Sequence, residues 1–271
     1  MERMHTSEVK KRIGERVRIA GFAETIRDQG SIKFLIVRDI SGFVQVVITK
    51  DKKGALETVS GLSLESVVEV FGLAKEEKQA PGGFEVAAET ISILSLSEPE
   101  LPIPVVEKGG QEETDQSIRL DWRWLDLRKP KNALVFKVWT LMEEAFREYW
   151  LGEKYLEIHS PKLIATASES GAEVFEVKYF ERKAFLAQSP QFYKQMAMAA
   201  GFERVFEVGP VFRAEPSFIS RHATEFTGYD AEISYIQSHY DVMAEEEKAI
   251  AHALKRVKEE YSREIREVFG R

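Results

Sequence analysis

Val211-Phe212-Arg213-Ala214-Glu215 is the stretch around which this chain is organised, and Arg221-His222 and Glu225-Phe226 follow it closely. Arg213 and Glu215 are two residues apart, so on an extended strand they share a face. The later residues come soon enough to lie on one loop and its return strand. Guanidinium groups bind phosphates bidentately, and an aromatic ring can stack on a base. The pattern therefore predicts a nucleotide site on an antiparallel hairpin.

Alternation along both predicted strands supports this interpretation. In 204–215 an apolar face, which we expect in the core, alternates with a polar one: Phe206, Val208 and Phe212 against Glu207, Arg213 and Glu215. The return strand, 228–236, alternates likewise: Tyr229, Ala231, Ile233 and Tyr235 against Asp230, Glu232 and Ser234. The two polar faces adjoin, which predicts a solvated sheet surface that forms the floor of a binding site. The alternative is an ordinary exposed sheet surface without a ligand. The arginine, histidine and phenylalanine of the loop favour a ligand.

Composition limits the class of protein. The 271 residues allow one large or two ordinary domains, and 44% hydrophobic residues suffice for folded cores. The lack of cysteine excludes disulfides, thiolate metal sites and a cysteine nucleophile, and it is typical of an intracellular, cytoplasmic protein. No apolar run approaches the ~18 residues of a membrane span. The charged N-terminus does not resemble a signal peptide.

Charge is distributed unevenly along the chain, whose net charge is −7. Residues 1–55 carry 12 Lys and Arg against 7 Asp and Glu, a charge of +5, whereas the remainder carries 26 against 38, a charge of −12. A basic N-terminal region predicts contact with a nucleic-acid backbone, and a patternless surface is the alternative.

The first hundred residues are rich in predicted strands. Five candidates surround one short helix near 52–60, namely 16–25, 32–39, 43–49, 66–74 and 84–96. Five short strands with one helix suit a closed barrel of the OB-fold type better than a β-sandwich. A proline-rich run, 98–104, then predicts an extended connection. We predict a barrel domain at 1–104, a linker at 105–131 and a second domain at 132–271.

The second domain mixes helices with strands. Apolar residues at three- and four-residue spacing predict a helix over 132–150 and a long closing helix from about 242. Ser189-Pro190 is typical of a helix start and predicts a helix over 191–200. Residues 174–180 and 184–188 predict a hairpin. Strands joined mainly by hairpins predict an α+β fold with an antiparallel sheet flanked by helices.

Several segments resemble class II aminoacyl-tRNA synthetases. Phe212–Glu215 with Arg221-His222 and Thr224-Glu225-Phe226 resembles motif 2, in the form found in aspartyl-tRNA synthetases of the archaeal and eukaryotic type. Residues 155–163 resemble motif 1, including Pro161 at the dimer interface. Three further segments resemble the mobile loop over the amino acid, the aspartate-binding segment and the hinge: 167–175, 188–194 and 119–128. The predicted barrel resembles the anticodon-binding OB-fold domain of this family.

The resemblance implies roles for the motif 2 residues in ATP binding. Arg213 would hold the α-phosphate and stabilise the charge that develops there, which makes it the catalytic residue. Glu215 would accept a hydrogen bond from the adenine amino group, and Phe226 would stack under adenine. Arg221 and His222 would bind the outer phosphates.

The resemblance also implies roles in binding aspartate and tRNA. Glu169 would pair with the α-ammonium, Lys194 with the side-chain carboxylate, and Gln191 would hydrogen-bond the substrate. Phe34 and Gln45 match the residues that stack on and read anticodon bases. Without the resemblance, Phe34 would be interpreted as a core residue, Lys194 as a lysine facing water, and Gln45 would carry no signal.

Three features depart from the family pattern. Ser170 stands where a glycine is usual after the glutamate of the mobile loop, and 216–220 is more apolar than the usual motif 2 loop. No glycine-rich motif 3 with its ATP-binding arginine occurs after 228, and no residue is assigned as a metal ligand. We therefore expect weak or no aminoacylation from these 271 residues alone.

The resemblance implies an aspartate–tRNA ligase. Such an enzyme converts aspartate and ATP to aspartyl-adenylate, with Mg²⁺ neutralising the phosphates, and then transfers the aspartyl group to tRNA. We expect tRNA-Asp, with tRNA-Asn left open, as its RNA substrate and a homodimer formed around Pro161. Two alternatives remain: a non-catalytic tRNA-binding protein derived from such an enzyme, and an asparaginyl- or lysyl-tRNA synthetase.

Overall fold

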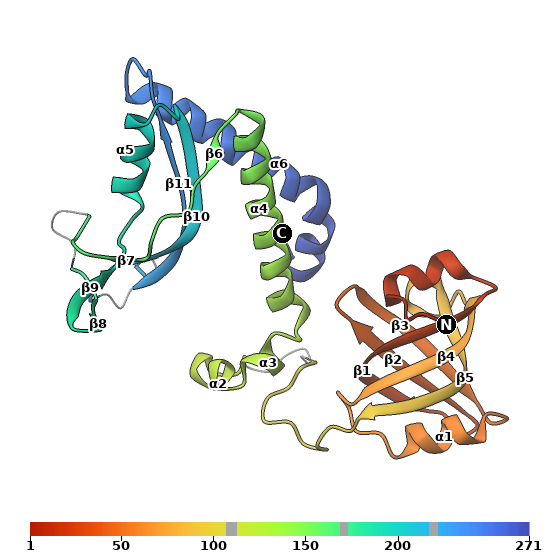
Figure 1. The fold of residues 1–271 in the computed structure, drawn as a ribbon. Helices are drawn as coiled ribbons and strands as arrows, with labels where there is room; N and C mark the ends of the chain where they lie inside the picture. Colours follow the sequence, from red (N-terminus) through yellow and green to blue (C-terminus); the bar gives the residue numbers. More distant parts are fainter. Residues whose placement is uncertain (107–112, 169–172, 217–221, 271) are drawn as a thin grey trace. The chain divides into compact units, whose positions relative to one another are not determined.

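The computed structural model describes residues 1–106, 113–168, 173–216 and 222–270 (Figure 1). The chain divides into two compact units, Met1–Lys129 and Pro130–Arg271, which are treated one at a time. This boundary lies inside the predicted linker, 105–131. Within the described ranges, no helix is both long enough and apolar enough to span a membrane.

The first unit contains the five-stranded barrel that the strand pattern predicts. Its strands and helix are β1 (Arg16–Asp28), β2 (Ile32–Asp39), β3 (Gly42–Thr49), α1 (Lys53–Ser60), β4 (Val67–Glu76) and β5 (Phe84–Ser95). They close in the order β1-β2-β3-β5-β4, with β1 pairing antiparallel to β4 and β3 parallel to β5. The OB-fold prediction is confirmed by this order and by the helix between β3 and β4.

Aliphatic side chains that alternate along the strands fill the barrel. Ile19, Leu35, Val37, Val46 and Val70 are fully buried, and α1 packs Ala55 and Val59 against the same cluster. Two glycines allow close strand contacts, because a Cβ at Gly21 would lie 2.3 Å from the Arg38 carbonyl oxygen and one at Gly72 would lie 2.2 Å from that of Ala87.

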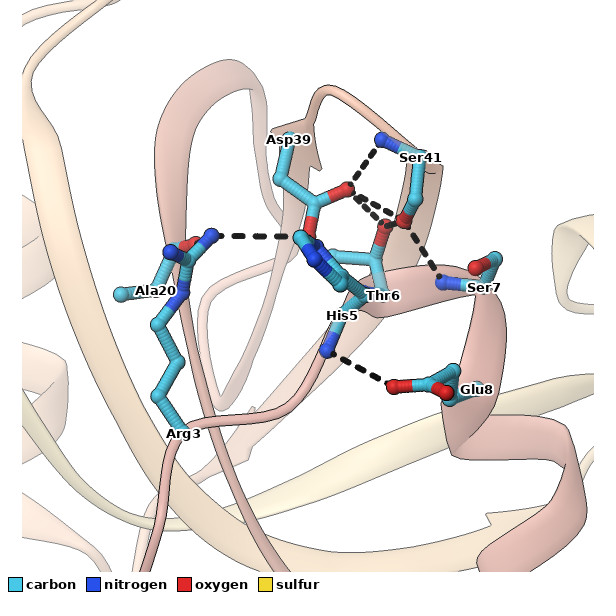
Figure 2. Close-up of polar contacts among 8 residues, drawn as sticks. All are labelled: Arg3, His5, Thr6, Ser7, Glu8, Ala20, Asp39 and Ser41. Atoms are coloured by element: carbon cyan, nitrogen blue, oxygen red, sulfur yellow. Dashed lines mark hydrogen bonds and ion pairs between the residues drawn. The ribbon is translucent and has the colours of Figure 1, made fainter.

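A short 3-10 helix, η1 (Thr6–Arg12), attaches the N-terminal segment to the barrel through the Asp39 carboxylate (Figure 2). Asp39 accepts hydrogen bonds from the Thr6 backbone N at 2.9 Å and Thr6 Oγ1 at 2.8 Å. It also accepts from the Ser41 backbone N at 2.8 Å and Ser41 Oγ at 2.6 Å. Burial raises the pKa of Asp39, but these hydrogen bonds together outweigh it and lower the pKa to about 2.

Residues after the proline-rich run also belong to the first unit. They form two short helices, α2 (Gln116–Asp121) and α3 (Arg123–Asp126). The Arg128 guanidinium lies 4.1 Å from the centre of the Phe22 ring and donates to Glu65 Oε2 at 3.0 Å. Arg38 donates to the same buried carboxylate at 2.7 Å. The segment is thus held against the barrel by a buried carboxylate between two arginines.

Over its described residues, the second unit contains two small sheets and three helices. Its elements are α4 (Pro130–Gly152), β6 (Leu156–Glu157), β7 (Leu163–Ile164), β8 (Glu176–Tyr179), β9 (Arg182–Leu186), α5 (Gln191–Ala199), β10 (Arg204–Phe212), β11 (Glu225–Ile233) and α6 (His239–Phe269). One sheet has the order β11-β10-β6, in which β6 is parallel to β10, and the other has the order β7-β9-β8. The α+β prediction is confirmed.

Opposite faces of the β10–β11 pair have different coverings. On one face, Phe206 is fully buried with its ring centre 4.8 Å from that of Trp150, and Phe146 lies 5.0 Å from Tyr229. This confirms the predicted apolar face, which packs on α4. On the other face we expected a solvated floor, and this is wrong at Glu207, which is only 3% exposed. Residues of the segment after β6 cover it there.

Candidate functional site

Arg213 directly follows β10 on the predicted hairpin. Antiparallel pairing places Val211 opposite Phe226, and the Arg213 backbone N donates to the Thr224 carbonyl oxygen at 2.9 Å, which continues the pairing past the strand end. The guanidinium carbon lies 5.5 Å from the centre of the Phe226 ring. The Arg213 Nε is buried and has no hydrogen-bond partner among the described residues. A buried, unsatisfied donor on a cation suits an anionic ligand.

Glu215 and His222 lie together in the connection between β10 and β11, Glu215 shortly after β10 and His222 shortly before β11. The His222 Nδ1 is 3.5 Å from Glu215 Oε2, and the two side chains are 50% and 40% exposed, respectively. Arg221 lies outside the described residues. Four of the five predicted ATP-binding residues are therefore brought onto one hairpin, in two contacting pairs: Arg213 with Phe226 and Glu215 with His222.

Lys194 is buried against β11, so the expectation from its helix position alone, that it faces water, is wrong. Its side chain is 5% exposed and forms ion pairs with Asp230 and, at 3.1 Å, with Glu232. It also donates to the Ala231 carbonyl oxygen at 3.3 Å. A buried lysine requires such partners, because an unpaired ammonium would lose its hydration. Two carboxylates around one ammonium leave the cluster with a formal charge of −1.

Gln188 was not assigned a role from the sequence, yet it holds the ends of the predicted mobile loop. It is fully buried. Its Oε1 accepts from the Ser168 backbone N at 3.1 Å, and its Nε2 donates to the Glu173 carbonyl oxygen at 3.4 Å. Glu169, between these two anchors, lies outside the described residues. Gln188 holds the loop through tertiary contacts, so the sequence could show only that it is the first residue of the run Gln188-Ser189-Pro190-Gln191.

Backbone hydrogen bonds join the predicted ATP and aspartate segments. The Phe212 backbone N donates to the Ala187 carbonyl oxygen at 2.9 Å, and the Ala214 backbone N donates to that of Glu173 at 3.0 Å. Gln191 starts α5 three residues after Gln188, and its backbone N donates to Ser189 Oγ at 3.3 Å. The end of β10, the end of the predicted mobile loop at Glu173 and the start of α5 thus form one continuous region.

A second cluster of predicted residues lies on the barrel. Phe34 is half-buried rather than a core residue, with the Arg27 guanidinium carbon 5.6 Å from its ring centre. Arg27 donates to Gln45 Oε1 at 2.9 Å, and Gln45 Nε2 donates to Glu85 Oε2 at 2.7 Å. Arg27 and Glu85 were not predicted from the sequence, because they come from β1 and β5 and meet Gln45 only in the folded barrel. The cluster offers an aromatic face beside the Arg27 guanidinium, whereas Gln45 and Glu85 are only 4% and 3% exposed.

Comparison with known families supports both parts of this description. Residues 115–271 match the model of class II tRNA synthetases (D, K and N), and residues 17–94 match that of the OB-fold nucleic acid binding domain. The chain is similar to an aspartate–tRNA(Asp/Asn) ligase of Methanopyrus kandleri, with 45% identity over 94% of this chain and 59% of that protein. It is 40% identical to an aspartate–tRNA(Asp) ligase of Pyrococcus horikoshii over 93% of this chain and 58% of that protein.

Solved structures show the same likeness. An asparaginyl-tRNA synthetase of Pyrococcus horikoshii in complex with asparaginyl-adenylate superposes with a TM-score of 0.90 at 34% identity, over 98% of this chain and 60% of that one. The chain thus spans about three-fifths of the length of these relatives. Since the synthetase model matches more than half of its residues, the chain belongs to the class II tRNA synthetases of the D, K and N group.

Proposed function

We propose that this protein functions as an aspartate–tRNA ligase, which activates aspartate with ATP and transfers it to tRNA in the cytoplasm. The observation that supports this most is the Arg213 guanidinium, which lies over Phe226 with a buried, unsatisfied Nε. The relatives named as aspartate–tRNA ligases match nearly the whole chain.

In this proposal the hairpin binds ATP. Phe226 stacks on adenine, Glu215 accepts from the adenine amino group, and Arg221 and His222 bind the outer phosphates. Arg213 binds the α-phosphate and stabilises the negative charge that grows there as the aspartate carboxylate attacks. Catalysis of this kind is electrostatic and needs no covalent enzyme intermediate.

Mg²⁺ would neutralise the ATP phosphates in such an enzyme. Among the described residues, no group of three or more His, Asp and Glu side chains could hold a metal ion. No residue is therefore assigned as a magnesium ligand, and no step of the proposed mechanism depends on a protein-bound metal.

Aspartate would bind between α5 and β11. Lys194 would pair with the side-chain carboxylate, Gln191 would hydrogen-bond the substrate, and Glu169 would pair with the α-ammonium. Such a site distinguishes aspartate from asparagine by the carboxylate.

The barrel would bind the anticodon of tRNA, with Phe34 stacking on a base and Gln45 hydrogen-bonding to another. A homodimer would form around Pro161, through α4 and the segment that follows it. Exposed apolar residues on α4 support that interface: Val135, Phe136 and Trp139, which are 53%, 43% and 45% exposed.

A non-hydrolysable aspartyl-adenylate analogue tests the proposal in an equilibrium titration by calorimetry. We expect the aspartyl analogue to bind more tightly than the asparaginyl and lysyl analogues. Arg213→Ala should weaken its binding roughly tenfold to a hundredfold, because a charged hydrogen bond contributes about 1.5–3 kcal/mol. The exposed Arg263 provides the matched control, Arg263→Ala, which should leave binding unchanged.

Two results would contradict the proposal. Equal affinity for the three analogues would exclude aspartate specificity. No binding of any analogue by a chain that binds tRNA would favour the non-catalytic tRNA-binding alternative.

A further inference from the structure

The β8–β9 hairpin ends in a strained aromatic turn. Tyr179 pairs with Arg182 across the hairpin, so the turn consists of Phe180 and Glu181 alone. Phe180 has a φ of +53°, in the left-handed region, and its side chain is 81% exposed. Glycine adopts that conformation without steric cost, whereas a bulky side chain does so only under strain. Nothing in the turn itself therefore favours phenylalanine.

The tip carries a second exposed ring. Tyr179 is 46% exposed, and its ring centre lies 5.0 Å from that of Phe180 at an interplanar angle of 75°. The edge-to-face arrangement fixes the orientation of both rings and leaves most of the Phe180 ring in solvent. An exposed, oriented aromatic pair is a typical contact surface for a planar ligand.

Positive charge lies directly beside these rings. Lys178 and Lys183 occupy opposite positions in the antiparallel pairing, and both are exposed. Like charges directly opposite each other destabilise a hairpin. Lys183 also pairs with Glu176 at 3.0 Å, which offsets part of this repulsion. Arg182, at the other side of the turn, adds a third exposed cation.

The positive φ of Phe180 and the two opposed lysines cost stability, and together with the exposed rings they match a single kind of ligand. Aromatic rings stack on unpaired bases, and ammonium groups attract the phosphates that flank them. A strained backbone at such a position is a reason to look for function. An acidic or apolar protein surface would use the charge or the rings, but not both.

We propose that this hairpin tip binds unpaired nucleotides at the 3′ end of tRNA, with Phe180 stacking on a base and Lys178 and Lys183 contacting phosphates. The proposal rests on the proposed function, which supplies tRNA as the substrate. The 3′ end is the unpaired part of tRNA that must reach the site of aminoacyl transfer. β9 runs from the tip to Leu186, close to Gln188, and its five residues span only about 17 Å at roughly 3.3 Å each.

Phe180→Gly tests the proposal, because it removes the ring and relieves the strain together. If the role of Phe180 were purely structural, replacing it would lower the melting temperature. We expect the melting temperature of the variant not to fall, because glycine relieves the backbone strain. We expect the variant to bind tRNA about fivefold to a hundredfold more weakly, the range for loss of one stacked base. A tRNA that lacks its unpaired 3′ nucleotides should bind the variant and the unchanged protein equally.

Tyr235→Gly is the matched control, since Tyr235 also has a positive φ, of +58°, and is 86% exposed. It should relieve strain in the same way and leave the affinity for tRNA unchanged. Lys178→Glu should weaken binding of the intact tRNA and reduce the salt dependence of its affinity.

Separate outcomes identify which idea fails. If the unchanged protein binds tRNA and Phe180→Gly has no effect, the tip does not contact the RNA and only this inference is overturned. Only this inference is also overturned if Phe180→Gly alters the oligomeric state in sedimentation but not the affinity for RNA. That result would indicate that the tip contacts a protein. If the unchanged protein binds no tRNA, the proposed function fails as well.

Discussion

Asp39 shows how one buried carboxylate attaches a terminal segment. Its carboxylate is 3% exposed, accepts hydrogen bonds from Thr6 on one side and Ser41 on the other, and lies 3.2 Å from the His5 Nδ1. Hydrogen bonds to the ionised form lower its pKa from 3.8 in the unfolded chain to about 2, in spite of burial. The folded state therefore binds a proton less readily than the unfolded state, and ionised Asp39 stabilises the fold.

The first prediction concerns the pH dependence of this attachment. The lowered pKa corresponds to about 2 kcal/mol of stability that is fully present above pH 4 and is lost as the pH falls through about 2. Hydrogen exchange of residues 3–12, measured by mass spectrometry from pH 2 to 5 and corrected for intrinsic rates, should show protection falling with the pH.

Two variants of the barrel check the cause. Asp39→Asn should abolish this pH dependence and reduce protection at pH 5. Asp51→Asn, which alters an exposed carboxylate of the same barrel, should leave the protection unchanged. Equal protection of residues 3–12 at pH 2 and pH 5 would contradict the role of Asp39.

Glu207 and Asp230 are two carboxylates that face each other across the β10–β11 pair, where like charges repel. Each has its own lysine: Lys162 pairs with Glu207, and Lys194 pairs with Asp230. The Ser160 backbone N and Oγ also donate to Glu207, at 2.8 Å and 3.0 Å. Glu207 can be buried within the sheet face because Lys162 neutralises it and because Lys194 neutralises the carboxylate opposite it.

The second prediction is that Lys162→Met destabilises the protein by about 3 kcal/mol, because it leaves the buried Glu207 charge without its cation. Adding Glu207→Gln should restore more than half of that loss, since the amide needs no counterion. Urea denaturation of the single and double variants measures both. Additive losses would show that the two residues do not form a coupled pair.

At the scale of elements, strand alternation predicted the two faces of β10 but not what covers them. Periodicity identified Phe206 and Val208 as core residues, and α4 covers them. It could not show that α5 places Lys194 on the other face, because helix-to-sheet packing has no local signature. The predicted strand 174–180 was longer than β8, and the predicted strand 184–188 began two residues later than β9, because the turn consists of Phe180 and Glu181.

Four strands of the barrel meet at the Phe34 cluster, and the third prediction concerns this surface. Phe34→Ala should weaken tRNA binding by about 1–3 kcal/mol, the contribution of one stacked base. Phe43→Ala, which removes another exposed ring on β3 of the same barrel, should have no effect. Filter binding of tRNA measures both variants. A similar loss from both would indicate that the barrel is destabilised rather than that a base contact is lost.

At the scale of the whole molecule, the first unit has a core of its own. The barrel cluster contains residues no later than Ile91, and a second cluster joins Ile103 and Val105 to Leu125. Arg128 ties the end of the unit to Glu65. A unit boundary at Lys129 therefore includes contacts that a boundary at 104 would remove.

The fourth prediction is that residues 1–129 fold alone, whereas residues 1–104 are less stable by about 2 kcal/mol, through lost apolar burial and the lost Arg128 hydrogen bond. Urea denaturation followed by circular dichroism compares the two fragments. Arg128→Ala in the longer fragment should reproduce part of the difference. Equal stability of the two fragments would favour the predicted boundary at 104.

The sequence by itself determined the family, the five strands of the barrel, the hairpin of Arg213 and Phe226, and the apolar face of β10. These properties are encoded locally, in alternation, spacing and turn residues. Only the tertiary structure decided that Lys194 and Glu207 are buried and paired, that Gln188 anchors the loop, and that Gln45 bridges Arg27 and Glu85. Those contacts join residues far apart in the chain, and the burial that makes them necessary arises only when sheet, helix and barrel pack.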